Sequence, residues 1–183
     1  MTPQRESELL LRLKDPERKN IAFRELVILY REKLYWQVRR MVVNHEDADD
    51  VVQNIFIRIF QNLEKFRGES TLYTWIYRIA INEIYSHLKA VKKRTAISFE
   101  SLPAGLEHKM LSDAYFTPTE IQLKFQKAIL QLPEKQRLVF NMKYFDEELT
   151  FERLSEILGT SEGALKASYH HAVKKIEKML KED

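Results

Sequence analysis

Cysteine is absent from this chain of 183 residues, which contains only four glycines and five prolines. Without cysteine, disulfide bonds and thiolate zinc sites are excluded, and a reducing compartment is favoured. Glycine and proline fall between segments of helical spacing, and no segment alternates as a strand would. The first twenty residues are charged throughout, and no apolar run has the length of a signal peptide or a membrane span. We therefore expect an all-α, cytoplasmic protein.

Helical periodicity dominates what is present. Apolar residues recur at helical spacing over residues 7–14, 20–43, 47–66, 70–94, 118–132, 133–145, 150–158 and 161–180. Residues 95–117 include Pro103 and Gly105 and show no sustained period, which predicts a flexible linker. Hydrophobic residues make up 44% of the chain, enough for a core in each half. We predict two small helical domains, residues 1–94 and 118–183, the second containing a helix-turn-helix.

The stretch LSEILGTSEGALKASYHHAVKKI, residues 154–176, predicts two helices joined by a turn. Gly159 stands where a left-handed C-cap is needed, and Thr160 or Ser161 can cap the next helix. One side of that helix is apolar and is predicted to face the core: Leu165, Tyr169, Ala172, Val173, Ile176, Met179 and Leu180. The opposite side carries Lys166, Ala167, His170, His171 and Lys174. A helix-turn-helix places such a face in the major groove of DNA, but a solvated surface has the same composition.

The stretch DADDVVQNIFIRIFQNL, residues 47–63, predicts a helix with two unlike faces. Its apolar stripe comprises Val51, Val52, Ile55, Phe56, Ile59, Phe60 and Leu63. The other side carries Asp50, Gln53, Asn54, Ile57 and Gln61. A solvated helix face is usually richer in lysine and glutamate, so low charge around an exposed isoleucine indicates a protein interface. The alternative is that Ile57 packs beneath a neighbouring helix.

The stretch STLYTWIYRIAINEIYSHLKAVKKR, residues 70–94, predicts a helix that combines aromatic and basic residues. Its apolar arc comprises Leu72, Ile76, Tyr77, Ile79, Ala80, Ile84 and Leu88. The other side carries Trp75, Arg78, Asn82, Tyr85, Ser86 and Lys89. Cations, exposed rings and an amide suit single-stranded nucleic acid, whereas the alternative is core aromatics with a basic last turn. Glu83 and His87 interrupt the apolar arc, and the sequence offers no reason for them.

Residues 47–88 and 132–176, in this order and at this separation, resemble conserved regions two and four of bacterial sigma factors of the extracytoplasmic-function class. The resemblance extends to the two-domain layout of the whole chain. It implies a protein that binds core RNA polymerase, directs it to promoter DNA and promotes strand opening. The partners implied are the β′ and β subunits of the polymerase, promoter DNA and an anti-sigma protein.

The resemblance also implies roles for individual residues. The set expected to bind the β′ subunit is Asp50, Gln53, Asn54 and Ile57. The set expected at the minus-ten element, including a loop that pockets a flipped base, is Phe66, Arg67, Ser70, Tyr73, Thr74, Trp75, Arg78, Asn82, Ser86 and Lys89. The set expected at the minus-thirty-five element is Thr160, Ser161, Lys166, Ser168, His170, His171 and Lys174. Family members often carry arginine on this helix, and lysine or histidine cannot form its bidentate contact with guanine.

Two other classes remain open on the sequence. A simple helix-turn-helix regulator would bind duplex DNA without polymerase, but it would not need the face around Ile57 or the aromatic and basic helix. An enzyme is not expected, because the sequence has no P-loop, GxSxG or HExxH motif. His170 and His171 point about 100° apart on a helix, which is unfavourable for binding one metal ion, and we expect no metal or cofactor.

Overall fold

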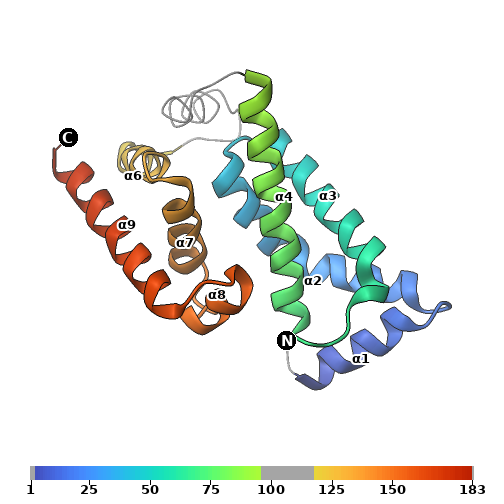
Figure 1. Ribbon diagram of the computed structural model, residues 1–183. Coiled ribbons are helices and arrows are strands. Elements are labelled where there is room, and N and C mark those ends of the chain that lie inside the picture. The colour runs from blue at the N-terminus through green and yellow to red at the C-terminus, as the bar shows by residue number, and fades with distance from the viewer. Residues whose placement is uncertain (1–2, 96–117, 183) are drawn as a thin grey trace.

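The computed structural model describes residues 3–95 and 118–182, which form helices and no strand (Figure 1). The all-α prediction is confirmed for these residues, and the predicted linker lies almost wholly outside them. The first half comprises α1 (Pro3–Lys14), α2 (Lys19–Val42), α3 (His45–Asn62), the 3-10 turn η1 (Leu63–Lys65) and α4 (Leu72–Thr95). The second half comprises α6 (Glu120–Leu130), α7 (Glu134–Phe145), α8 (Phe151–Leu158) and α9 (Glu162–Glu182). None of the described helices is both long and apolar enough to cross a membrane.

Side chains at the helix ends explain most boundaries. The Asn44 side chain accepts a hydrogen bond from the Asp47 amide at 2.7 Å and caps α3. Thr119 and Gln122 form a reciprocal capping box at the start of α6. Between α2 and α3, the buried Val43 has a φ of 77°, which is strained for a β-branched residue. The turn between α2 and α3 is therefore fixed by packing rather than by local preference.

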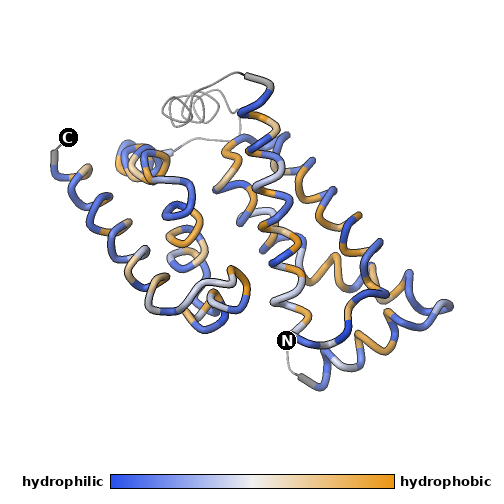
Figure 2. The backbone as a smooth tube through the Cα atoms, in the orientation of Figure 1, coloured by the Kyte–Doolittle hydropathy of each residue, from blue (hydrophilic) through white to orange (hydrophobic). Residues whose placement is uncertain are grey.

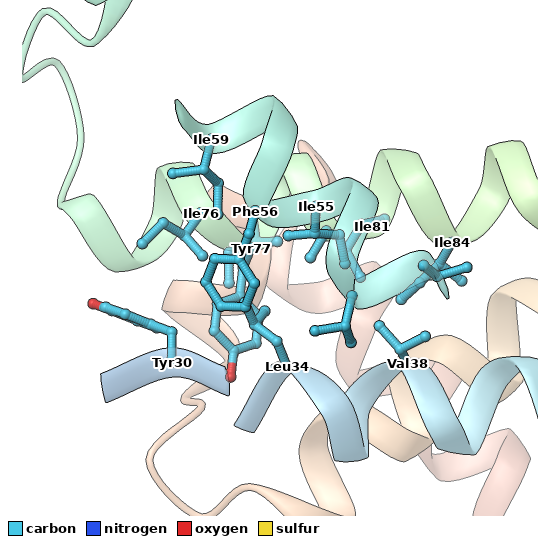
Figure 3. Packing of buried hydrophobic residues seen from close by; sticks show 14 of the residues in the cluster. Tyr30, Leu34, Val38, Ile55, Phe56, Ile59, Ile76, Tyr77, Ile81 and Ile84 are labelled. Atoms are coloured by element: carbon cyan, nitrogen blue, oxygen red, sulfur yellow. The ribbon is translucent and has the colours of Figure 1, made fainter. Parts of the chain in front are cut away.

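In the first half, α2, α3 and α4 pack their apolar faces together, and Figure 2 shows polar and apolar residues alternating along each helix. The core residues labelled in Figure 3 are Tyr30, Leu34, Val38, Ile55, Phe56, Ile59, Ile76, Tyr77, Ile81 and Ile84. The predicted stripe of α3 is confirmed except at Phe60, which is 37% exposed. The two interruptions of the α4 arc have partners, because Glu83 pairs with Arg58 and His87 lies 3.7 Å from Asp47.

In the second half, α6 and α7 pack against α9 around Ile129, Phe140 and Ile176. The predicted core side of α9 is buried or half-buried at most positions, but the prediction is wrong for Leu180, which is 40% exposed. The hydrophobic cluster includes Ile176 and Met179, and the last turn of α9 extends beyond it.

The two halves are not separate units in this structure. Leu138, Met142 and Ile157 of the second half belong to the same hydrophobic cluster as the core of the first half. The packing joins α8 to α4 and α7 to α2. Figure 1 shows the two halves side by side. We call this packing of α7 and α8 against α2 and α4 the closed arrangement.

Candidate polymerase and nucleic-acid interfaces

The exposed face of α3 borders an apolar groove. Asp50, Gln53, Asn54 and Ile57 are all exposed, and Ile57 keeps 47% of its surface accessible. The alternative in which Ile57 packs beneath a neighbouring helix is therefore wrong. Low charge and an accessible aliphatic side chain are features of a protein-binding surface.

The walls of this groove come from both α2 and α3. Its volume is about 360 Å³, and it is lined by Phe23, Val27, Gln53, Phe56, Ile57, Phe60 and Gln61. The ring of Phe23 meets that of Phe60 edge to face at 4.9 Å. Phe60, predicted to be core, thus helps to form the groove. The contribution of Phe23 and Val27 was missed, because the sequence shows no pairing between the two helices.

The loop between η1 and α4 is anchored by buried contacts. The Phe66 ring is 5% exposed and packs against Trp75, with 5.1 Å between ring centroids. Arg67 is exposed and Ser70 is half-buried. The first amide of α4, from Leu72, donates to the Glu6 carboxylate of α1 at 2.7 Å. The α1 helix therefore fixes the start of α4 across 66 residues of sequence.

Only part of the predicted strand-reading face of α4 is open to solvent. The exposed residues of this face are Arg78, Asn82, Ser86 and Lys89. Trp75 and Tyr85 were predicted to be exposed here, but both are half-buried, because they pack against the hydrophobic cluster, as Tyr73 does. The Tyr73 ring stacks on that of Tyr77 at 4.3 Å. Burial raises the pKa of Tyr77 to about 12 and that of Tyr73 well above its ordinary value.

In the closed arrangement, α8 covers the N-terminal part of this face. The buried Thr74 hydroxyl donates to the Glu156 carboxylate at 3.1 Å. The Arg78 guanidinium donates from Nε and Nη2 to the main-chain carbonyl of Glu156, at 3.1 and 2.7 Å. Tyr73 Oη donates to Asp146 at 3.2 Å. Three side chains expected to bind unpaired bases therefore bind the second half of the same chain.

The structure also brings parts of the two DNA-binding sets together. A cleft of about 620 Å³ is lined by Arg78 and Asn82 from α4, by Thr160 from the turn after α8, and by Ser168 from α9. The minus-ten and minus-thirty-five sets thus share one cleft in the closed arrangement. Both elements of a promoter cannot be read from one cleft, because they lie apart along the duplex.

Polar groups buried between the halves are incompletely satisfied. Asn141 donates to the carbonyl of Arg40 at 3.2 Å, but its Oδ1 has no donor among the described residues. Arg137 is 1% exposed, and its Nε and Nη2 have no acceptor among the residues that the structure describes. Burial lowers the pKa of Arg137. Each unsatisfied buried group costs about 1–3 kcal/mol, so this interface is weaker than its apolar packing alone would make it.

The helix-turn-helix forms as the sequence predicts. Gly159 adopts φ 61°, the left-handed C-cap of α8, and Ser161 Oγ accepts from the Ala164 amide at 3.4 Å. Thr160 Oγ1 donates instead to the Leu158 carbonyl at 3.4 Å. On α9 the predicted outward residues are exposed and Ser168 is half-buried; the exposed set is Lys166, Ala167, His170, His171 and Lys174.

A third lysine joins this surface from α7. Lys143 Nζ and Lys166 Nζ each lie 5.8 Å from the centre of the Phe151 ring. Cation–π contacts of this kind hold both ammonium groups beside one ring. The sequence analysis did not assign Lys143 or Phe151 to this surface. Nothing in the sequence indicates that either residue approaches α9. The arrangement extends the basic surface of the recognition helix onto α7.

Known proteins resemble this chain over nearly its whole length. A family model for sigma-70 region 2 matches residues 26–95, and a model for sigma-70 region 4 matches residues 122–176. The ECF RNA polymerase sigma factor SigW of Bacillus subtilis is 30% identical over 171 residues, which are 88% of this chain and 90% of that protein. The RNA polymerase sigma-H factor of Pseudomonas aeruginosa is 31% identical over 98% of this chain and 96% of its own length.

Two solved structures share the fold. The sigma factor RpoE of Bartonella quintana, in complex with the anti-sigma factor NepR, matches with a TM-score of 0.67 and 22% identity, over 88% of this chain and 98% of that one. CnrH, in complex with the cytosolic domain of CnrY, matches with a TM-score of 0.68 and 18% identity, over 97% and 98%. The match to both regions and the two relatives together show that this chain belongs to the extracytoplasmic-function class of the sigma-70 family of RNA polymerase sigma factors.

Proposed function

We propose that this chain, acting in the cytoplasm and without catalysis of its own, binds core RNA polymerase through the groove between α2 and α3. The observation that carries the proposal is the exposed Ile57 beside uncharged Gln53 and Asn54, together with a helix-turn-helix in the same chain. A simple helix-turn-helix regulator needs no such groove. The β′ subunit is the expected partner of this face, and the β subunit the expected second contact of the polymerase.

Promoter recognition falls to α9 and α4. The exposed lysines and histidines of α9, with Lys143, would bind the minus-thirty-five duplex, where lysine neutralises phosphate and His170 faces base edges. Asn82 and Ser86 of α4, with the loop around Arg67 and Ser70, would bind unpaired bases of the minus-ten element. Thr74 and Arg78 can join them only after their hydrogen bonds to Glu156 are broken. The closed arrangement must therefore open before both elements are bound.

An anti-sigma protein is a further proposed partner. RpoE of Bartonella quintana is in complex with the anti-sigma factor NepR, and CnrH is in complex with the cytosolic domain of CnrY. A partner that holds the two halves of this chain together would prevent α4 and α9 from reaching separate promoter elements.

Core binding is the decisive test. Ile57→Glu places a carboxylate at the mouth of an apolar groove, and burying an unpaired charge costs far more than losing a methyl contact. We expect at least about a tenfold loss of affinity for core polymerase, which is about 1.4 kcal/mol. The measurement is fluorescence anisotropy of a dye-labelled chain titrated with core polymerase.

Leu11→Glu is the matched control. Leu11 is 72% exposed on α1 and lies outside the groove, so the same change of charge should leave core affinity intact. Circular dichroism melts should be alike for both variants, because neither side chain is buried. Equal core affinity for Ile57→Glu and Leu11→Glu would refute the docking site, and a parent chain that fails to bind core polymerase would favour the simple regulator.

A further inference from the structure

A further groove lies between the two halves, and none of its lining residues was assigned above to polymerase or DNA. It has a volume of about 390 Å³ and runs between α2 and the turn that joins α7 to α8. Trp36, Gln37 and Arg40 contribute from α2, and Phe145, Asp146 and Glu147 contribute from the other half. Because both halves form its walls, this groove exists only in the closed arrangement.

One wall of the groove carries a buried polar group that lacks a partner. Gln37 is 3% exposed, and its Nε2 makes no hydrogen bond within the described residues. A buried amide donor left unpaired costs about 1–3 kcal/mol, so an acceptor brought into the groove would be favoured. Rotation of the amide about its last side-chain torsion is enough to direct its donors. The groove is therefore prepared for a ligand with a hydrogen-bond acceptor.

The charges around the groove favour a cation. Four carboxylates line it and two cationic side chains oppose them. Lys33 is held by Glu148 at 2.7 Å, and the Arg40 guanidinium lies over the Phe145 ring at 4.1 Å, facing Asp146. Glu32 and Glu147 remain, both exposed and without an ion pair among the described residues. The rim thus has two carboxylates available for a positive group.

An aromatic platform stands between these features. Trp36 is 48% exposed, and Glu32 lies four residues before it, on the same face of α2. The indole ring is the best of the side-chain rings for binding a cation. A guanidinium or ammonium group over Trp36 would therefore also be near a carboxylate.

We propose that this groove binds a cationic peptide segment of a protein partner. An arginine or lysine side chain of the segment lies over Trp36 between Glu32 and Glu147, and a main-chain carbonyl accepts from Gln37. A polyamine has positive charge but no hydrogen-bond acceptor for Gln37, whereas a peptide has both. A peptide therefore fits the groove better than a polyamine. An occupant that touches both halves stabilises the closed arrangement, because it binds only that state. Its effect on transcription rests on the function proposed above, but its binding does not.

The test begins with random dodecapeptides displayed on phage and panned against the full-length chain, with Trp36→Ala protein used for counter-selection. We expect the enriched peptides to carry arginine or lysine beside apolar residues. The best peptide and spermidine are then titrated by calorimetry in the absence of polymerase and DNA, so failure of the proposed function would not affect the result.

Substitutions in the groove locate the binding. Trp36→Ala, and separately Glu32→Gln combined with Glu147→Gln, should each weaken the peptide at least about tenfold, or 1.4 kcal/mol. Trp36→Phe, which keeps a ring, and Glu177→Gln, an exposed change on α9, should retain most of the affinity. The proposal is overturned by enrichment of acidic peptides or of none, by affinity that ignores the groove variants, or by spermidine binding as tightly as the peptide.

Discussion

Replacing Glu156 by alanine is expected to loosen the closed arrangement. The side chain accepts the hydrogen bond of Thr74, whereas Arg78 donates to the main-chain carbonyl of the same residue. The substitution therefore removes the first contact and keeps the second. Glutamate and alanine are both good helix formers, so α8 itself should remain intact. The change acts on the interface between the halves rather than on the helix.

The size of the effect follows from the exposure of the two partners. A hydrogen bond to a charged group contributes about 1.5–3 kcal/mol. Glu156 is exposed, so water screens the carboxylate and can partly replace it, which places the loss near the lower end. A loss of about 1.4 kcal/mol changes an equilibrium constant about tenfold. We expect the ratio of open to closed molecules to rise by that factor.

Energy transfer between two dyes reports the separation directly. Because the chain has no cysteine, Lys14→Cys on α1 and Lys181→Cys on α9 give specific attachment sites, one in each half. Single-molecule histograms of the Glu156→Ala variant should gain a low-transfer population. Glu152→Ala removes the same charge one turn earlier on α8, where no interdomain contact is seen in the described chain, and serves as the control. Identical histograms for the two variants would refute the reasoning.

Two further predictions concern α4. Asn82→Ala should slow promoter opening about tenfold or more, because an amide contact to a base is worth about 1–3 kcal/mol. Core affinity should stay unchanged. Permanganate reactivity of thymines measures the opening, and a premelted template should restore part of the lost rate. Burial raises the pKa of Tyr73 and Tyr77, so the folded state keeps both hydroxyls protonated at a pH where the unfolded chain loses these protons. Their contribution to the free energy of unfolding is therefore fully present below pH about 10 and is lost as the pH rises toward 12. Urea unfolding at pH 9 and 11 should show this fall, and Tyr77→Phe should reduce it.

The helices were predictable because their signals are local. Periodic apolar residues and Gly159 determine α8 and α9, and the capping box at Thr119 determines the start of α6. A boundary that depends on a distant residue was displaced. The helix predicted from residue 70 begins at Leu72, whose amide is bound by Glu6 of α1. Periodicity contains no information about such a contact.

The candidate site was predictable only where it faces solvent. Outward positions on α3 and α9 follow from a helical wheel, and they are exposed in the structure. The contacts of Thr74 and Arg78 with Glu156 could not be predicted, because no sequence pattern links polar residues that lie about eighty positions apart. Phe60 was misplaced for a related reason. A wheel assigns an aromatic residue to the core, but Phe60 lies at the edge of the stripe, where it packs against Phe23 and keeps 37% of its surface exposed.

The same side chains cannot hold the two halves together and read DNA. Arg78 already directs Nε and Nη2 at one carbonyl, and the Thr74 hydroxyl donates to the Glu156 carboxylate, so the promoter contacts that we propose for these two residues require that these bonds break. A partner that shifts a closed chain from 99:1 to 1:99 must favour the open state by about 5.5 kcal/mol. Unsatisfied polar atoms on Arg137 and Asn141 reduce that requirement, because water reaches them when the interface parts. An interface with such groups is suited to reversible opening, and an apolar one of equal area would hold the chain closed against polymerase.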